Sequence, residues 1–231
     1  MKCNNVSKKS ERYIKLSYDC DKYGPYPPGI PIPKITKFTS LEKGDVANQY
    51  MITICNHTGT HVDAPAHVVD DGLRISDFDV SDFVYESLIL IDVKVIDYEL
   101  MQPKLFERYE KNIAESDILL IRTGYCKYRK KDTERYKMKG PGFSARLAEY
   151  IVSSFPNLKA LGLDAISLAA IKYIDEGMEA HKVLLSGINR KFLIYEAMDL
   201  RPNLSGLKKL IALPWLIKEI DSAPCSILGI I

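Results

Sequence analysis

Short apolar runs alternate with amphipathic segments along this 231-residue chain, and this alternation constrains the fold more than any other feature. Residues 118–122 and 159–163 are compact apolar runs that predict strands. Residues 144–154 place apolar side chains at helical spacing, behind Ser144 as a candidate N-cap. Strands that alternate with helices are typical of mixed α/β folds. We therefore predict an α/β protein.

The remaining elements follow from the same patterns. Residues 87–96 are so rich in Leu, Ile and Val that we expect a strand buried on both faces. The proline-rich segment 24–33 excludes helix and central strand, so it predicts a stiff extended loop that carries Tyr26. Such a loop can form a substrate wall or pack on the surface. Further strands are predicted at 13–18, 50–55, 191–195, 207–213 and 225–230, and further helices at 103–112 and 179–186.

The chain shows no internal repeat and no linker. We predict a flexible N-terminal segment at residues 1–12 and a single domain at residues 13–231. A net charge of +2, with scattered lysines, gives no argument for nucleic-acid binding. The basic run 127–131 is followed by Asp132 and Glu134 and is interpreted as a solvated loop.

Membrane insertion and secretion find no support in the sequence. No stretch approaches the about 20 apolar residues of a membrane span, and the polar N-terminus lacks the apolar core of a signal peptide. The five cysteines are odd in number and widely spaced. This pattern favours reduced thiols in a cytoplasmic protein.

Three of the four histidines, His57, His61 and His67, lie within eleven residues. The spacing of His57 and His61 matches the helical zinc motif, but Gly59, the threonines and Pro65 oppose a helix. The segment is better interpreted as a tight loop after a strand, with Gly59 permitting the turn. Asp63 follows His61 by two residues, so both side chains point the same way if the backbone is extended.

Imidazole and carboxylate ligands suit Zn²⁺, Mn²⁺ or Fe²⁺. Three protein ligands with an open position are typical of a catalytic metal site, where the pKa of a water falls from about 15.7 to about 7. His67, beyond Pro65, is expected near the metal as a general acid or base. Cys55 could be a ligand, although a buried strand thiol is favoured. His181 alone predicts only a histidine on a helix surface.

The segment His57-Thr-Gly-Thr-His61-Val-Asp63-Ala-Pro-Ala-His67 resembles the signature of the putative cyclase family, which includes bacterial kynurenine formamidases and isatin hydrolases. The resemblance extends over most of the chain. Further similar motifs are Leu119-Leu-Ile-Arg-Thr-Gly-Tyr125, Leu161-Gly-Leu-Asp-Ala-Ile-Ser167, His181-Lys-Val-Leu-Leu185 with Glu196, and Leu213-Pro214.

The resemblance implies specific roles. His57, His61 and Asp63 would hold a first metal ion, and Asp63 and Glu196 would bridge toward a second ion that His181 also binds. His67 would be the catalytic acid/base, with Glu196 also part of the catalytic site. The implied fold is a mixed, barrel-like β-sheet flanked by helices, usually in a homodimer.

Three positions depart from the family pattern. His181 and Glu196 are fifteen residues apart, about three more than expected, with residues 189–191 as the apparent insertion. The substrate-stacking Trp-Pro of the kynurenine formamidases corresponds to Tyr26-Pro27, which makes Tyr26 the candidate substrate-binding residue. The family's terminal Pro-x-Arg corresponds to Pro224-Cys225-Ser226, which removes a charge.

We therefore predict a metal-dependent hydrolase of a small amide, formamide or lactam, with one or two divalent ions per chain. Zn²⁺ is favoured and Mn²⁺ is an alternative. A second hypothesis has a single ion acting on a cyclic substrate such as isatin or a lactone. A third is a metal-holding scaffold protein without turnover, although metal binding alone does not require His67.

Overall fold

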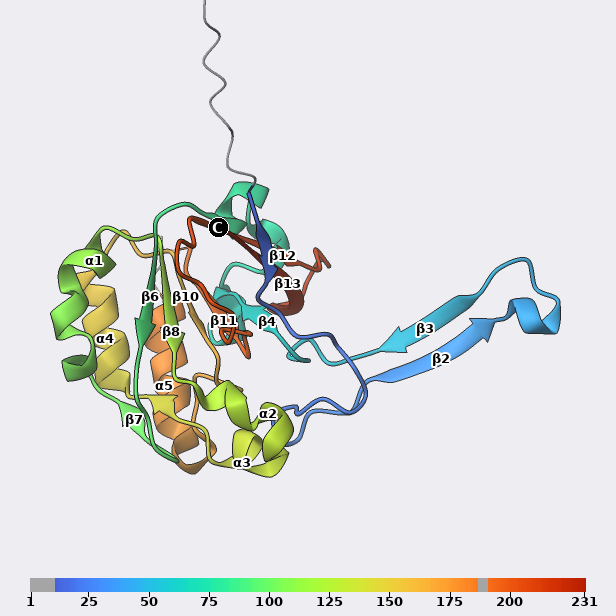
Figure 1. Ribbon diagram of the computed structural model, residues 1–231, viewed down its shortest axis with the longest axis horizontal. Helices are drawn as coiled ribbons and strands as arrows, with labels where there is room; N and C mark the ends of the chain where they lie inside the picture. Colours follow the sequence, from blue (N-terminus) through green and yellow to red (C-terminus); the bar gives the residue numbers. More distant parts are fainter. Residues whose placement is uncertain (1–10, 187–190) are drawn as a thin grey trace, which may run out of the picture.

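The computed structural model describes residues 11–186 and 191–231, in which a strongly curved mixed sheet forms the centre of the body (Figure 1). Residues 1–10, which make up most of the predicted flexible segment, and residues 187–190 lie outside the described residues. Along the sheet, the described strands are β5 (Val84–Tyr85), β12 (Lys209–Pro214), β13 (Ser222–Ile230), β4 (His61–Asp63), β11 (Leu193–Glu196), β10 (Ala160–Leu163), β8 (Ile118–Arg122) and β6 (Leu88–Asp92), with β1 (Tyr13–Lys15) also paired to β13.

The sheet divides into a parallel and an antiparallel half. Strands β6, β8, β10 and β11 are parallel, whereas β4, β13, β12 and β5 pair antiparallel. The end strands β5 and β6 are consecutive in the chain, so the sheet curls back on itself. Asp117, just before β8, accepts hydrogen bonds from the backbone N–H groups of the connecting residues Glu86 and Ser87. The predicted barrel-like mixed sheet is thus confirmed.

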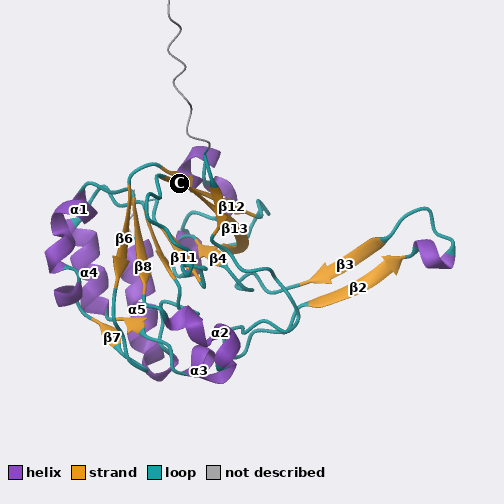
Figure 2. Cartoon of the chain, in the orientation of Figure 1, coloured by secondary structure: helices purple, strands orange, loops and turns teal. Residues whose placement is uncertain are grey.

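Helices cover the outer face of the parallel half, where Figure 2 shows α4 (Ala145–Ser154) and α5 (Ile174–Leu185) beside the strands. Side chains alternate along β8: Leu119 and Ile121 join the core beneath these helices, while Ile118 and Leu120 join a second core inside the curved sheet. Ser144 caps α4 as predicted, because its side chain accepts a hydrogen bond from Leu147 N. The remaining helices are α1 (Glu110–Ala114), α2 (Tyr128–Lys131) and α3 (Thr133–Met138).

A long hairpin projects from the body (Figure 1). It consists of β2 (Lys34–Thr39) and β3 (Gln49–Thr53), joined through a 3-10 turn at Leu41–Lys43. Nearly every residue of its strands is exposed. A second small sheet pairs β7 (Leu100–Met101) with β9 (Gly142–Phe143) at the foot of the helices. None of the described helices has the length and apolar character that crossing a bilayer requires.

Most predicted strands are present, and the differences have physical reasons. The strand β6 is only partly buried because it is the last strand of the parallel half. The predicted helix at 103–112 is instead two 3-10 turns followed by the short helix α1. The basic run 127–131 is helical rather than a loop, and Arg129 is buried with its guanidinium over the Tyr18 ring. Cys55 lies after β3, half-buried and outside any strand, so its prediction as a buried strand thiol is wrong.

Candidate metal centre

The strand β4 positions the centre of the site. It lies between β11 and β13, with His61 paired to Glu196 on one side and Asp63 paired to Ser222 on the other. His61 and Asp63 alternate with Val62, which points into the core, so the two polar side chains share the opposite face. The turn before the strand depends on Gly59, whose φ of 71° is in the left-handed region. The predicted loop-and-strand geometry of this segment is confirmed.

Six of the predicted residues converge on one buried position. Asp63 Oδ1 lies 3.2 Å from His57 Nδ1 and 3.5 Å from His61 Nε2. Glu196 Oε2 lies 3.3 Å from His61 Nε2. On the far side, Glu196 Oε1 lies 3.2 Å and Asp63 Oδ2 lies 3.9 Å from His181 Nε2. The His67 ring completes the cluster, with its centroid 4.5 Å from the His57 ring and 5.7 Å from the His181 ring.

Backbone carbonyls define the tautomers of two of these histidines. His61 Nδ1 lies 3.0 Å from the carbonyl oxygen of Gly59, and His181 Nδ1 lies 2.8 Å from that of Gly177. A carbonyl oxygen only accepts, so each Nδ1–H must donate. In the neutral imidazoles, Nε2 therefore carries the lone pair, and in both residues Nε2 faces the carboxylates. A second hydrogen bond that orients a ligand in this way is typical of metal-binding histidines.

A divalent cation fits these atoms. His61 Nε2 and both carboxylate oxygens of Asp63 are buried, and none has a hydrogen-bond partner among the described residues. Buried polar atoms are normally paired, because an unpaired one costs about 1–3 kcal/mol. Lone pairs of His61 and His181 that face carboxylate oxygens repel them unless positive charge lies between. The ligand atoms of His57, His61 and Asp63 all lie within 4.8 Å of one another, as three ligands of one ion require.

The electrostatics of the cluster also favour positive charge. Burial lowers the pKa of His57, but contacts with Asp221 and Asp63 outweigh it and raise the pKa to about 10. The pKa values of His61 and His181 are likewise raised, because the nearby carboxylates outweigh burial. Burial opposes ionisation of Glu196, yet its contacts with His181 and His61 outweigh burial and hold its pKa well below the usual range. The surrounding carboxylates thus favour positive charge at this position, as a bound cation would supply.

Glu196 is also fixed by the chain segment that follows β10. Its Oε1 accepts hydrogen bonds from the backbone N–H of Leu168, at 2.6 Å, and from the hydroxyl of Ser167, at 3.1 Å. His181, on α5, is buried beside this segment, with 2 % of its surface exposed. From sequence alone, His181 predicts a helix-surface position, and that interpretation is wrong. The family resemblance implied that His181 lies near Asp63 and Glu196, and its Nε2 does lie 3.9 Å and 3.2 Å from these two carboxylates.

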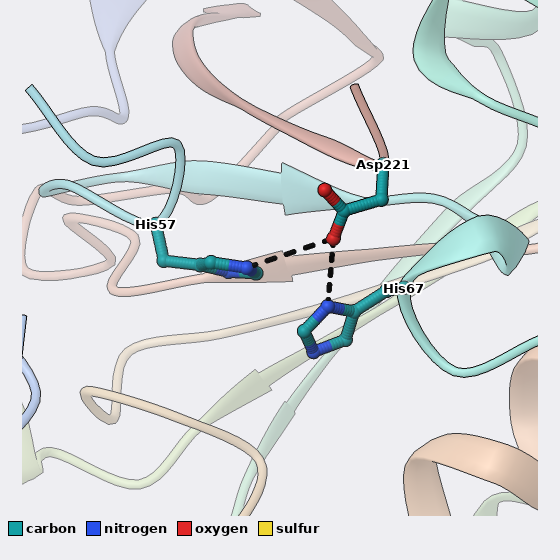
Figure 3. A group of neighbouring side chains, drawn as sticks. All are labelled: His57, His67 and Asp221. Atoms are coloured by element: carbon teal, nitrogen blue, oxygen red, sulfur yellow. Dashed lines mark hydrogen bonds and ion pairs between the residues drawn. The ribbon is translucent and has the colours of Figure 1, made fainter. Parts of the chain in front are cut away.

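Asp221 is the residue of the cluster that the sequence analysis missed (Figure 3). Its Oδ2 lies 2.9 Å from His67 Nδ1 and 3.7 Å from His57 Nε2. Contacts with the two histidines, that with His57 first, hold the pKa of Asp221 well below its usual range. No local motif marks this residue, which is 154 positions from His67 in the chain.

Tyr26 lies apart from the cluster. Among the described residues it makes no hydrogen bond, ion pair or ring contact with the predicted metal ligands. Its ring is buried, and its hydroxyl donates to the backbone carbonyl of Asp21. A different aromatic residue adjoins the histidine turn: Trp215 lines an open cavity of about 500 Å³ together with Thr58 and Thr60, the neighbours of the histidines.

Comparison with known proteins identifies the family of this chain. Residues 14–170, more than half of the chain, match the family described as putative cyclase. The chain belongs to this family. An uncharacterized protein of Haemophilus influenzae is 30% identical over 132 residues, which cover 57% of this chain and 87% of that protein.

Two further proteins are similar over nearly the whole length. A kynurenine formamidase of Bacillus cytotoxicus is 28% identical over 218 residues, covering 94% of this chain and 96% of the relative. Among solved structures, isatin hydrolase A from Labrenzia aggregata superposes with a TM-score of 0.78 at 21% identity, covering 96% of this chain and 94% of that one. At this identity the superposition establishes the shared fold alone.

Proposed function

We propose that this protein is a metal-dependent hydrolase of a small amide, formamide or lactam. The observation that carries the proposal is the group of buried, unpartnered ligand atoms on His61 and Asp63. The similarity to a kynurenine formamidase over nearly the full length of both chains supports hydrolysis of a non-peptide C–N bond. The similarity to a kynurenine formamidase and to an isatin hydrolase supports a small-molecule substrate.

The proposed ligand sets follow from the contacts. His57, His61 and Asp63 would hold a first cation, with Asp63 and Glu196 extending toward a second at His181. We propose Zn²⁺, with Mn²⁺ as the alternative, because nitrogen and carboxylate ligands suit both. The cation, when bound, supplies a Lewis acid that polarises the substrate carbonyl and makes a water molecule more acidic.

His67 is proposed as the acid/base. Its Nδ1 is engaged by Asp221, which leaves Nε2 to exchange protons with water and with the departing nitrogen. A ring nitrogen of His67 lies within 4.8 Å of ligand atoms of Asp63 and His181. A proton held on that nitrogen would therefore lie close to the proposed metal ligands. Glu196 would contribute its charge to the same site, between Nε2 of His61 and Nε2 of His181.

Protein purified without chelator, analysed for its metals, and screened against formamides, lactams and lactones tests this function. We expect at least one divalent ion per chain and turnover of a formamide or lactam. His67→Asn should retain the metal and lose turnover, whereas the matched variant His61→Asn should lose both. Unchanged turnover in His67→Asn would remove this residue from the mechanism.

Two alternatives give different outcomes in the same experiments. One tight ion per chain, with turnover of isatin or a lactone, would favour the mononuclear hydrolase. Full metal loading without hydrolysis of any substrate in the screen would favour a scaffold protein. The second ligand group supports two ions, because Asp63 and Glu196 both approach His181. Tyr26 stays a proposed substrate contact, tested by a raised KM in Tyr26→Ala.

We further propose a homodimer, supported by the hairpin of β2 and β3. A two-stranded hairpin is at best marginally stable in water on its own. This hairpin nevertheless exposes apolar side chains, including 69% of Phe38, 59% of Met51 and 52% of Ile52. Sedimentation at micromolar concentration should give a dimer that Phe38→Asp weakens, while Ile96→Asp, at an exposed isoleucine of the body, leaves it intact. A monomeric wild type would contradict this proposal.

A cytoplasmic location is also proposed. The cysteines among the described residues, Cys20, Cys55, Cys126 and Cys225, form no disulfide. Free thiols of this kind persist in a reducing compartment. Fractionation of cells that express the untagged chain tests this location.

A further inference from the structure

Asp221 stands immediately before β13, outside the segment that holds the histidine signature. The β4–β13 ladder pairs Ser222 with Asp63. The backbone carbonyl of Asp221 also accepts a hydrogen bond of 2.9 Å from Ala64 N. The strand pairing therefore places this carboxylate beside the start of the turn that carries His67. Its position is therefore set by the pairing within the sheet.

The carboxylate is oriented by two donors of its own. Asn56 Nδ2 donates to Oδ1 at 2.8 Å, and the Ser222 hydroxyl donates to Oδ2 at 2.9 Å. Oδ2 then points toward the two imidazoles (Figure 3). It lies within hydrogen-bond distance of His67 Nδ1 and, at 3.7 Å, within reach of charge interaction with His57 Nε2.

These contacts join two different roles. The other nitrogen of His57, Nδ1, faces Asp63 at 3.2 Å, on the side of the proposed cation. His57 is thus held between one carboxylate on the metal side and another behind it. A ligand histidine with a carboxylate behind it is better oriented and more basic. His67 receives the same support from the same oxygen, because an ionised carboxylate only accepts and its partner Nδ1 must donate.

We propose that Asp221 is the shared positioning residue of this site, orienting the metal ligand His57 and selecting the Nδ1–H tautomer of the acid/base His67. The inference rests on the proposed function for the role of His67. It extends that function because one carboxylate outside the histidine signature would support both the metal ligand His57 and the proton-transfer residue His67. Removing its charge should therefore lower metal affinity and turnover together.

The first test measures tautomers and needs no variant. The protein has four histidines, so ¹⁵N-histidine labelling gives a spectrum that can be assigned residue by residue. In the Zn²⁺-loaded wild type, neutral His67 should carry its proton on Nδ1. Observation of the Nε2–H tautomer would overturn the inference, whatever the activity of the protein.

The second test uses Asp221→Asn, which keeps the size of the side chain and removes its charge. Zn²⁺ affinity, measured by chelator competition, and kcat should each fall about 10–100-fold. Asp221→Glu, which restores the charge one methylene further out, should recover part of both. Ser222→Ala, which removes only one hydrogen bond to Oδ2, should show a smaller loss in the same direction.

Asp92→Asn is the matched control, because Asp92 is likewise ion-paired, to Arg122, but on the sheet edge strand β6. It should leave metal affinity unchanged. If His67→Asn abolishes turnover while Asp221→Asn keeps wild-type metal affinity and kcat, the inference fails and the proposed function stands. If no substrate is hydrolysed, the proposed function fails, and metal affinity and the His67 tautomer still decide whether Asp221 positions the site.

Discussion

Substitution of Gly177 by Ala should damage the metal site from a distance. Gly177 lies on α5 against the segment after β10, and a Cβ built there would lie 2.4 Å from both Cα and Cβ of Ala169. Ordinary van der Waals contact begins at 3.4 Å, so helix or segment must move by about 1 Å. The carbonyl of Gly177 holds His181 Nδ1, and the neighbouring Leu168 N holds Glu196. His181 and Glu196, the two residues proposed to bind the second cation with Asp63, would therefore both shift.

The size of the effect can be worked out from two opposing terms. Overpacking of a tight contact costs about 1–3 kcal/mol. Alanine in place of glycine in a helix interior returns about 1 kcal/mol. Because a 2.4 Å approach to backbone and side chain is severe, we expect a net loss near the upper end, about 2 kcal/mol. For a domain of this size that lowers Tm by about 4–8 °C.

The assay combines unfolding of the metal-free protein with metal binding to the folded protein. Gly177→Ala should show the lower Tm and also weaker Zn²⁺ binding. The matched control Glu179→Ala, at an exposed position of the same helix, should change neither. Wild-type stability together with wild-type Zn²⁺ affinity in Gly177→Ala would refute the argument that this contact positions His181.

Three further predictions follow from the site and its supports. The pKa of His57 is raised to about 10, so at neutral pH a cation must displace the proton of this residue. Because rising pH removes that proton, the apparent Zn²⁺ affinity should increase about tenfold per pH unit between pH 7 and 9. A flat profile in chelator competition would contradict this. Chelation of the metal should lower Tm by about 5–11 °C, because a ligand at 100 times its Kd stabilises the folded state by about 2.7 kcal/mol. Calorimetry with and without EDTA checks this, and an identical Tm would count against a bound metal. Asp164 is fully buried and accepts hydrogen bonds from Thr123 N, Thr123 Oγ1 and Gly124 N. Asp164→Asn should therefore lower the free energy of unfolding in urea by about 2–3 kcal/mol, whereas Asp70→Asn, at an exposed position, should not change it. Equal stability of the two variants would be inconsistent with this role.

The sequence allowed the local part of the site to be predicted well. Gly59 and Pro65 exclude a helix, and the two-residue spacing of His61 and Asp63 puts both on one face of a strand. These are short-range properties of the backbone, which a single sequence carries in full. The convergence of His181 and Glu196 on the same position needed the family resemblance. Nothing in the chain around His181 distinguishes it from a histidine on an exposed helix face.

Sequence patterns failed where partners are distant. The largely apolar run 50–55 predicts a strand, and β3 is one, but the pattern does not say what the strand faces. The strand leads into the histidine segment as predicted, but its side chains are exposed, and it belongs to the hairpin that projects from the body in Figure 1. The position of Asp221 depends in the same way on the register of β13 against β4.

The site lies where the sheet changes from parallel to antiparallel pairing, and this explains why these residues meet. Glu196 ends β11, the last parallel strand, and in such sheets polar groups collect beyond the carboxyl ends of the strands. The antiparallel neighbour β4 runs the opposite way and brings His61 beside Glu196. On its other edge, β13 adds Asp221 behind the histidines. One central strand of three residues thus has a carboxylate from each neighbour, Glu196 on the metal side and Asp221 behind the histidines. A one-residue slip of the β11–β4 ladder would separate Glu196 from His61, and a slip of the β13–β4 ladder would separate Asp221 from His57 and His67.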